Sequence, residues 1–186
     1  MSDTRERIVQ KTAELLTLQG YHGTGLNQIV KESDTPRGSL YYYFPSGKEE
    51  LAAEAVRYRG KAMQAHISHE LAKFDSPQEA IYQLVQTMII NLLRRNFTTG
   101  APVAGVAMEA SKASEVLREA CQEVYVMVKQ PLYEKLKLVY GADADRLALG
   151  IVAALEGALV LAYTQRSAEP LEAVAEMVRC CLEKSF

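Results

Sequence analysis

Arginine, serine and three consecutive tyrosines lie together in residues 35–44, TPRGSLYYYF. An arginine can read a guanine edge through two hydrogen bonds, and hydroxyl groups commonly bind phosphate or sugar. Pro36 is suited to the first position of a helix, whose first turn meets bases and phosphates when it enters the major groove. The segment therefore predicts a DNA-recognition helix, with Arg37 as the residue that reads a base.

A second short helix is expected just before it. Leu26, Ile29 and Val30 recur at i, i+3 and i+4, which forms one apolar helical face. Thr24 is placed to cap this helix, and Thr35 to cap the next. Two short helices joined by a tight turn are the helix-turn-helix arrangement that fits one helix into DNA.

The predicted contacts divide between bases and the phosphate backbone. Arg37 should read a base, whereas Gln28 reaches either a base edge or solvent. Tyr43 either contacts phosphate or packs on Pro45, and Tyr41 is expected to face the small core with its helical neighbours. The full predicted DNA-binding set is Thr24, Gln28, Thr35, Pro36, Arg37, Gly38, Ser39, Tyr42, Tyr43 and Lys48.

The net charge argues against a strongly basic DNA binder. The chain of 186 residues has a formal charge of −2, and its first fifty residues hold six Lys or Arg against seven Asp or Glu. Nucleic-acid binders are more often basic. A specific binder of modest salt dependence is the favoured interpretation, and a small-molecule sequestering protein without specific DNA binding is the alternative.

These residues and their spacing resemble the tetracycline-repressor (TetR) family of bacterial transcription regulators. The Phe-Pro-Ser-Gly-Lys turn at 44–48 is similar to the Phe-Pro-Gly-Gly-Lys turn of a subgroup that includes multidrug-resistance regulators, as is GAPVAGVAMEAS from Gly100. The matching residues are Ala13, Leu16, Gly20, Tyr21, Thr24, Ile29, Arg37, Gly38, Leu40, Tyr41, Tyr42, Phe44, Lys48, Glu49 and Leu51.

The resemblance implies a homodimeric, ligand-responsive regulator, expected to be a repressor that a small hydrophobic or aromatic effector releases from double-stranded operator DNA. It implies a helix-turn-helix head over 1–47 and a ligand-binding and dimerisation body over 48–186. Helical periodicity and capping signals independently predict an all-α chain of about nine helices. We expect helices to end at Gly20 and near Tyr140, and to begin after Ser76 and Ser114.

Methionine and tyrosine side chains are scattered over the expected body helices, where they either line an adaptable pocket or form ordinary core. Glu109 and Glu156 interrupt apolar stretches, and each could bind a ligand, cap a helix end or lie at the surface. The candidate pocket set is Met63, Tyr82, Met88, Met108, Tyr125 and Glu156.

Small and apolar residues form stripes on the last two expected helices. They either complete the core of one subunit or form the two-fold helical dimer interface that the resemblance implies. The candidate dimer residues are Ala153, Ala154, Gly157, Ala158, Val174, Met177, Val178 and Cys181.

No catalytic constellation is recognisable, so an enzyme is not expected, and neither a cofactor nor a metal is predicted. Three cysteines favour reduced thiols over a disulfide framework. We expect no signal peptide, no apolar run long enough to cross a membrane, and a cytoplasmic location.

Overall fold

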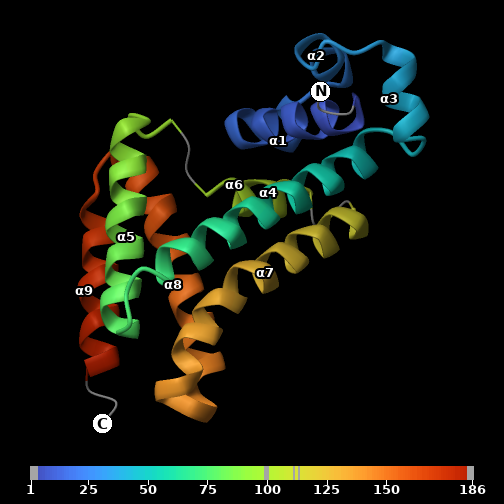
Figure 1. Ribbon diagram of the computed structural model, residues 1–186. Helices are drawn as coiled ribbons and strands as arrows, with labels where there is room; N and C mark the ends of the chain where they lie inside the picture. The colour runs from blue at the N-terminus through green and yellow to red at the C-terminus, as the bar shows by residue number, and fades with distance from the viewer. Residues whose placement is uncertain (1–3, 99–100, 111, 113, 184–186) are drawn as a thin grey trace. The chain divides into compact units, whose positions relative to one another are not determined.

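The structure is a computed structural model that describes residues 4–98, 101–110, 112 and 114–183. Within these residues all regular secondary structure is helical, which confirms the all-α prediction (Figure 1). The elements are α1 (Thr4–Gly23), α2 (Leu26–Glu32), α3 (Arg37–Tyr43), α4 (Lys48–Leu71), α5 (Pro77–Arg94), α6 (Pro102–Ala110), α7 (Glu115–Tyr140), η1 (Gly141–Asp143), α8 (Ala144–Gln165) and α9 (Glu169–Glu183).

The chain divides into two compact units. The first comprises Met1–Lys61 and Pro102–Val124, and the second comprises Ala62–Ala101 and Tyr125–Phe186. Helices α4 and α7 therefore each contribute residues to both units. The predicted boundary between residues 47 and 48 follows function rather than packing, and it stays a prediction.

In the first unit, α1 packs along α6 and also contacts α2 and α3 (Figure 1). Ile8, Ile29, Leu40 and Phe44 are at most 1% exposed and form its core with neighbouring apolar side chains. Burying each such side chain stabilises the fold by roughly 1.5–3 kcal/mol. The recognition-helix candidate α3 is thus held by its inner face, through Leu40 and Phe44.

In the second unit, α9 packs on both α5 and α8 (Figure 1). Leu171 and Leu182 of α9 are almost fully buried. Tyr140 donates a 2.8 Å hydrogen bond to the carbonyl oxygen of Leu182, and Gln78 donates one of 2.8 Å to the Tyr140 hydroxyl. These bonds fix the C-terminal end of α9 to α5 and to the end of α7.

Several helix ends follow the sequence signals. The Ser76 hydroxyl accepts from the Glu79 amide at 3.4 Å, and the Ser114 hydroxyl accepts from the Leu117 amide at 3.1 Å. Gly141 follows α7 with a φ of 50°. Gly20 has a φ of 72° and kinks α1, which continues beyond it to Gly23. The predicted helix starts after Ser76 and Ser114 are therefore confirmed.

The two threonine caps predicted for the helix-turn-helix are wrong. Gly25 is the N-cap of α2 and Pro36 that of α3, and neither has a side-chain capping hydrogen bond. Pro36 thus precedes the first helical position instead of occupying it. The Thr24 and Thr35 hydroxyls are bonded elsewhere within the head.

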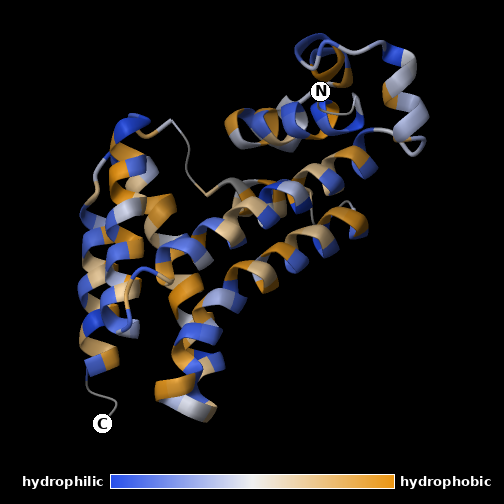
Figure 2. Cartoon of the chain, in the orientation of Figure 1, coloured by the Kyte–Doolittle hydropathy of each residue, from blue (hydrophilic) through white to orange (hydrophobic). Residues whose placement is uncertain are grey.

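Apolar residues run along α8 (Figure 2). The helical stretch Glu115–Gln165 contains an 18-residue window of mean hydropathy 1.9, so by length and composition alone it could cross a membrane. The expectation that no run is apolar enough is therefore wrong. Core helices of soluble proteins pass the same test, and the buried face of α8 packs on α9.

Candidate functional site

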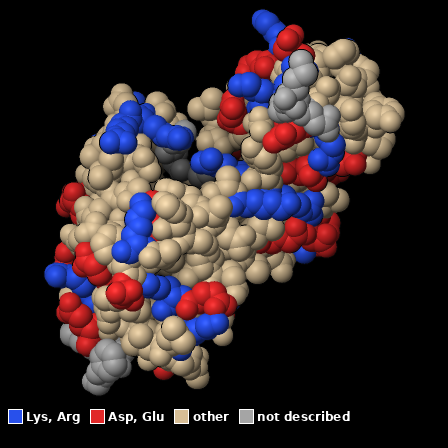
Figure 3. Space-filling model, viewed as in Figure 1, with Lys and Arg blue, Asp and Glu red and all other residues tan. Residues whose placement is uncertain are grey.

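Helix α3 presents a polar outer face. Arg37 and Gly38 are exposed at its start, and Tyr42 is 79% exposed. The Arg37 guanidinium carbon lies 5.9 Å from the centre of the Tyr41 ring, a distance compatible with cation–π attraction. The surface over α3 is largely uncharged (Figure 3). Arg37 is therefore accessible at the surface, and its contact with a base stays a prediction.

The tyrosines of α3 point in different directions. Tyr41 was expected in the core but is 43% exposed, because Leu40 and Phe44 at i and i+4 already fill the inner face. The Tyr43 ring is half-buried and packs edge-to-face on Tyr42, with ring centres 5.0 Å apart. Tyr42 is thus the most accessible hydroxyl of the three for a phosphate or sugar.

Two predicted DNA contacts are buried instead. Thr24 is 0% exposed and donates a 2.7 Å hydrogen bond to the carbonyl oxygen of Gly20. Thr35 is 7% exposed, and its hydroxyl lies 2.8 Å from that of Ser33. Both hydroxyls therefore stabilise turns of the head, and we correct their assignment as DNA contacts. Pro36 is exposed and Ser39 half-buried beside Arg37.

Gln28 of α2 belongs to a surface network. Its Oε1 accepts a 2.7 Å hydrogen bond from Gln19, and its Nε2 donates one of 2.9 Å to Glu32. A DNA base would have to compete with these partners. Gln28 consequently supports the orientation of α2 as well as being a candidate for base contact.

Lys48, the first residue of α4, lies against α1. Its ammonium is 4.3 Å from the centre of the Tyr21 ring. Burial lowers the pKa of Lys48, while the nearby Glu109 carboxylate acts in the opposite direction. Lys48 as a whole is half-buried. Its contact with a phosphate stays a prediction, and the ammonium would make it either from its position on the Tyr21 ring or after leaving that ring.

Glu109 has a role that sequence reasoning left open between ligand, helix end and surface. Its Oε2 accepts a 3.0 Å hydrogen bond from the backbone amide of His22, 87 positions away. A Cβ atom at Gly20 would stand 2.2 Å from the Glu109 Oε1. Glu109 is itself exposed, so it lies at the surface, from where its carboxylate accepts from an amide near the end of α1.

The candidate pocket residues are placed unequally. Met63, Tyr82, Met88 and Tyr125 are half-buried on α4, α5 and α7. Met108 is 84% exposed on α6, so this chain does not enclose it, and we leave it out of the candidate pocket. Its exposure reflects its position on the outer side of a short helix whose inner residues, Val103 and Val106, are buried.

Glu156 of α8 is the most unusual carboxylate among the candidates. Its Oε2 is buried and has no hydrogen-bond partner among the described residues. Burial raises the pKa of Glu156 to about 6, since desolvation disfavours the charged form. Such a group is suited to accept a hydrogen bond from a ligand that carries a donor or a positive charge.

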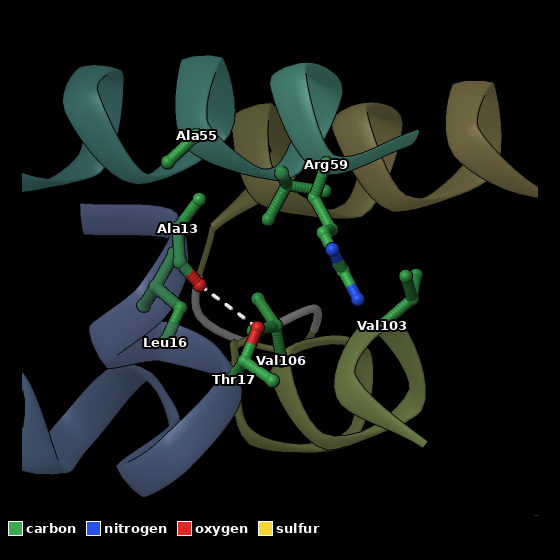
Figure 4. A pocket seen from close by; sticks show the side chains of 8 residues that line it. Ala13, Leu16, Thr17, Ala55, Arg59, Val103 and Val106 are labelled. Carbon is green, nitrogen blue, oxygen red and sulfur yellow. Dashed lines mark hydrogen bonds between the residues drawn. The ribbon is translucent and has the colours of Figure 1, made fainter. Parts of the chain in front are cut away.

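Cavities lie within each unit. In the first, Arg59 of α4 extends beside Thr17 of α1 and Val103 of α6 (Figure 4). This cavity of about 10 Å³ is too small for more than a water molecule. In the second unit, a groove of about 320 Å³ lies between α4 and α7, and its lining residues are Gln64, Ser68, Leu71, Ala72, Gln130, Pro131, Glu134 and Lys135. None of the predicted pocket residues lines either cavity.

The candidate dimer residues divide between surface and core. Ala153, Gly157, Met177 and Cys181 are exposed, and Ala154 and Val174 are half-buried. Ala158 is only 3% exposed, so it completes the packing of this subunit and we correct its assignment. Val178 is 5% exposed and also lines the groove between α8 and α9. The further exposed apolar residues of α8 are Leu149, Val160, Leu161 and Tyr163.

A groove between α8 and α9 adjoins this apolar surface. It has a volume of about 210 Å³ and is lined mainly by apolar side chains, among them Leu147, Ile151 and Met177. Contiguous apolar surface of this kind marks an interaction site more often than a free surface. The sequence missed the groove, because it depends on how two helices cross.

Comparison with known proteins gives two family matches. Residues 8–55 match the model described as "Bacterial regulatory proteins, tetR family". Residues 77–177 match the model described as "Transcriptional regulator LmrA/YxaF-like, C-terminal domain". The first match covers α2 and α3, and the second covers most of α5 to α9.

Individual relatives align over nearly the whole chain. An uncharacterized HTH-type transcriptional regulator of Bacillus subtilis, YxaF, is 38% identical over 98% of this chain and 96% of its own. The HTH-type transcriptional regulator LmrA of the same organism is 36% identical, with 98% of both chains covered. A TetR transcriptional regulator structure from Chloroflexus aurantiacus is 27% identical with a TM-score of 0.80, covering 97% of this chain and 94% of its own.

Proposed function

Because this chain belongs to the tetR family of bacterial regulatory proteins, we propose that it is a repressor that binds operator DNA as a homodimer and is released by a small hydrophobic or aromatic effector. Membership of this family makes the chain a helix-turn-helix transcriptional regulator and not an enzyme. The sign of regulation, the dimer and the effector are the proposed part. A bacterial regulator of transcription acts where the chromosome lies, so we infer a cytoplasmic location.

The observation that carries this proposal is the accessibility of the start of α3. Its inner residues Leu40 and Phe44 anchor the helix, which leaves Arg37 and Gly38 free to approach DNA. The backbone of Gly38 has open space around its Cα, with nothing within 4 Å of an added Cβ. An exposed arginine and an uncrowded backbone in the first helical turn suit close approach to a major groove.

A dimer suits this proposal because two recognition helices must lie one DNA turn apart, about 34–36 Å. The exposed face of α8 with Ala153 and Gly157, continued on α9 by Met177, is the interface we propose. The small residues would let a helix of the second subunit approach closely. The 210 Å³ groove beside them would receive a larger side chain from the partner.

We place the effector in the second unit near Glu156. Its buried, unpartnered oxygen favours a molecule that combines an apolar body with a hydrogen-bond donor or a cationic group. Release requires that the effector bind the DNA-free conformation more tightly. A hundredfold preference corresponds to ~2.7 kcal/mol of coupling.

The decisive experiment is a titration of purified protein against a duplex that the wild-type protein selects from a random-sequence library, at fixed salt and with random DNA as competitor. Arg37→Ala should weaken binding to the selected duplex about 10- to 100-fold, which corresponds to ~1–3 kcal/mol for a bidentate base contact. Arg95→Ala removes the same charge from an exposed position at the end of α5 and serves as the matched control. Undiminished binding by Arg37→Ala would contradict the assigned reading residue.

The same titration distinguishes the alternative function. If the wild-type protein selects no sequence over random DNA, the helix-turn-helix does not read an operator in this chain. A protein that sequesters small molecules would then be the better description. The near-neutral charge of the first fifty residues is the observation that favours this alternative.

A further inference from the structure

The α1–α2 connection, from the kink at Gly20 to Gly25, is held by hydrogen bonds from within the head. Gly20 interrupts α1 with a φ of 72°, and its carbonyl oxygen accepts from the buried Thr24 hydroxyl at 2.7 Å. Gln19 donates a 2.8 Å hydrogen bond to the carbonyl oxygen of Gly23. The chain then enters α2 at Leu26. Within the same connection the Thr24 amide donates to the Tyr21 carbonyl oxygen at 3.3 Å, whereas the His22 amide has its partner on another helix.

Helix α6 supplies such a partner through Glu109. The Glu109 Oε2 accepts a hydrogen bond from the His22 backbone amide at 3.0 Å. The carboxylate occupies space that a side chain at residue 20 would fill, since a Cβ atom there would lie 2.2 Å from Oε1 and 2.9 Å from Cδ. Glycine at residue 20 therefore does two things: it permits the positive φ and it admits the carboxylate.

The same carboxylate acts on the start of α4. Tyr21 lies between Gly20 and His22 and carries the Lys48 ammonium 4.3 Å from its ring centre. The negative charge of Glu109 favours the charged form of Lys48, against the effect of burial. The end of α1 and the first residue of α4 thus both depend on one side chain of α6.

We propose that Glu109 is a positioning residue for DNA binding, which fixes the α1–α2 connection and so sets the direction in which α2 and α3 meet the groove. Groups that contact a ligand need supporting residues that hold them to within roughly 0.5 Å. Glu109 provides such support from a helix that lies outside the helix-turn-helix. The inference rests on the operator binding proposed above.

The test compares Glu109→Ala, Glu109→Gln and wild-type protein on the duplex that wild-type protein selects from a random library. Glu109→Ala should bind this duplex at least tenfold more weakly, while its binding to random DNA stays within twofold. Glu109→Gln keeps an oxygen that accepts from the His22 amide, so its affinity should stay within about threefold of wild type. Glu14→Ala is the matched control, because it removes an exposed carboxylate of α1 that pairs with Lys11 at 2.6 Å.

Two further readouts separate positioning from a general loss of folding. Thermal unfolding followed by circular dichroism gives the temperature range in which every variant is folded, and the DNA titrations are made there. Amide hydrogen exchange at His22 should be at least tenfold faster in Glu109→Ala than in wild type, and close to wild type in Glu109→Gln.

Wild-type operator affinity in Glu109→Ala would overturn the proposal. An equal loss of operator and random binding would also overturn it, because it would show a damaged fold rather than a displaced recognition helix. A Glu109→Gln variant as weak as Glu109→Ala would exclude the hydrogen bond as the cause. If wild-type protein selects no duplex, the proposed function itself fails, and this proposal with it.

Discussion

Gly60 of α4 lies so close to Val124 of α7 that a Cβ atom at residue 60 would stand 2.5 Å from the Val124 Cγ2. Gly60 is buried. Beside this contact, Arg57 donates two hydrogen bonds to the Glu123 carboxylate, at 2.6 and 3.0 Å. The two helices therefore meet at a position where only glycine fits, next to a bidentate ion pair.

Replacing Gly60 by alanine should destabilise the protein. Overpacking costs about 1–3 kcal/mol, which exceeds the gain of up to about 1 kcal/mol in helix propensity. Urea unfolding at constant protein concentration measures the change. In a Val124→Ala background the same Gly60→Ala substitution should cost much less, because both methyl groups are gone and only the contact with the residue 124 Cβ, at 3.1 Å, remains.

Gly105→Ala on α6 is the control for that experiment. An added Cβ there meets nothing within 4 Å, so the substitution should be neutral or slightly stabilising. Equal effects of Gly60→Ala and Gly105→Ala would show that the α4–α7 contact is looser than its geometry indicates.

Glu156 should make stability depend on pH in a narrow window. Its pKa is raised by burial to about 6 from 4.5, so the folded chain binds a proton between these values that the unfolded chain has released. Stability contributed by this group is therefore present below about pH 4.5 and lost as pH rises through about 6. The cost at pH 7.5 is at most ~2 kcal/mol.

Glu156→Gln tests this assignment. The variant should be more stable than wild type at pH 7.5, by up to ~2 kcal/mol, and the difference should shrink towards pH 4.5. Other carboxylates, such as Glu70 and Glu123, have lowered pKa values and act oppositely, so the difference between the two proteins is the quantity to measure. A difference independent of pH would place the perturbed carboxylate elsewhere.

The three thiols should differ widely in reactivity. Cys121 is buried on α7, and burial raises its pKa to about 11, so almost no thiolate forms at pH 7.5. Cys180 is exposed on α9. With a disulfide reagent such as Ellman's, the double variant Cys180→Ser/Cys181→Ser should react at least 100-fold more slowly than wild type when folded. Unfolded in guanidinium chloride, this variant should react rapidly at one thiol per chain, that of Cys121. Fast reaction in the folded state would contradict the burial of Cys121.

The helices of this chain could be predicted because their signals are local. Ser76 and Ser114 stand three residues before the amides they cap, and the apolar periods of α5 and α9 are regular. Thr24 looked like the same signal, but its hydroxyl turns back to the carbonyl of Gly20, where α1 is interrupted four residues earlier. In so short a connection two helix ends compete for one hydroxyl, and the sequence does not indicate which wins.

The site was less predictable because it depends on contacts between distant segments. Arg37, by its place in the first turn after Pro36, and Tyr42, by its spacing from Leu40 and Phe44, were predicted on exposed positions, and both are exposed. The bond from His22 to Glu109 spans 87 positions, and only the unexpected carboxylate in an apolar stretch pointed to it. Similarly, a stripe of small residues on α8 did not reveal that Ala158 faces inward while Gly157 faces outward.

Gly157 offers the sharpest test of the proposed dimer. It is exposed, and an added Cβ meets nothing within 4 Å in this chain, so glutamate fits the subunit without a clash. In a helical interface the same side chain would bury an unpaired charge, at a cost of several kcal/mol. Sedimentation equilibrium should show Gly157→Glu as a monomer at concentrations where wild type is dimeric, and its affinity for the selected duplex should fall. Ala65→Glu, which adds the same charge at an exposed position of α4, should stay dimeric. A Gly157→Glu protein that dimerises like wild type would show that α8 does not form the interface.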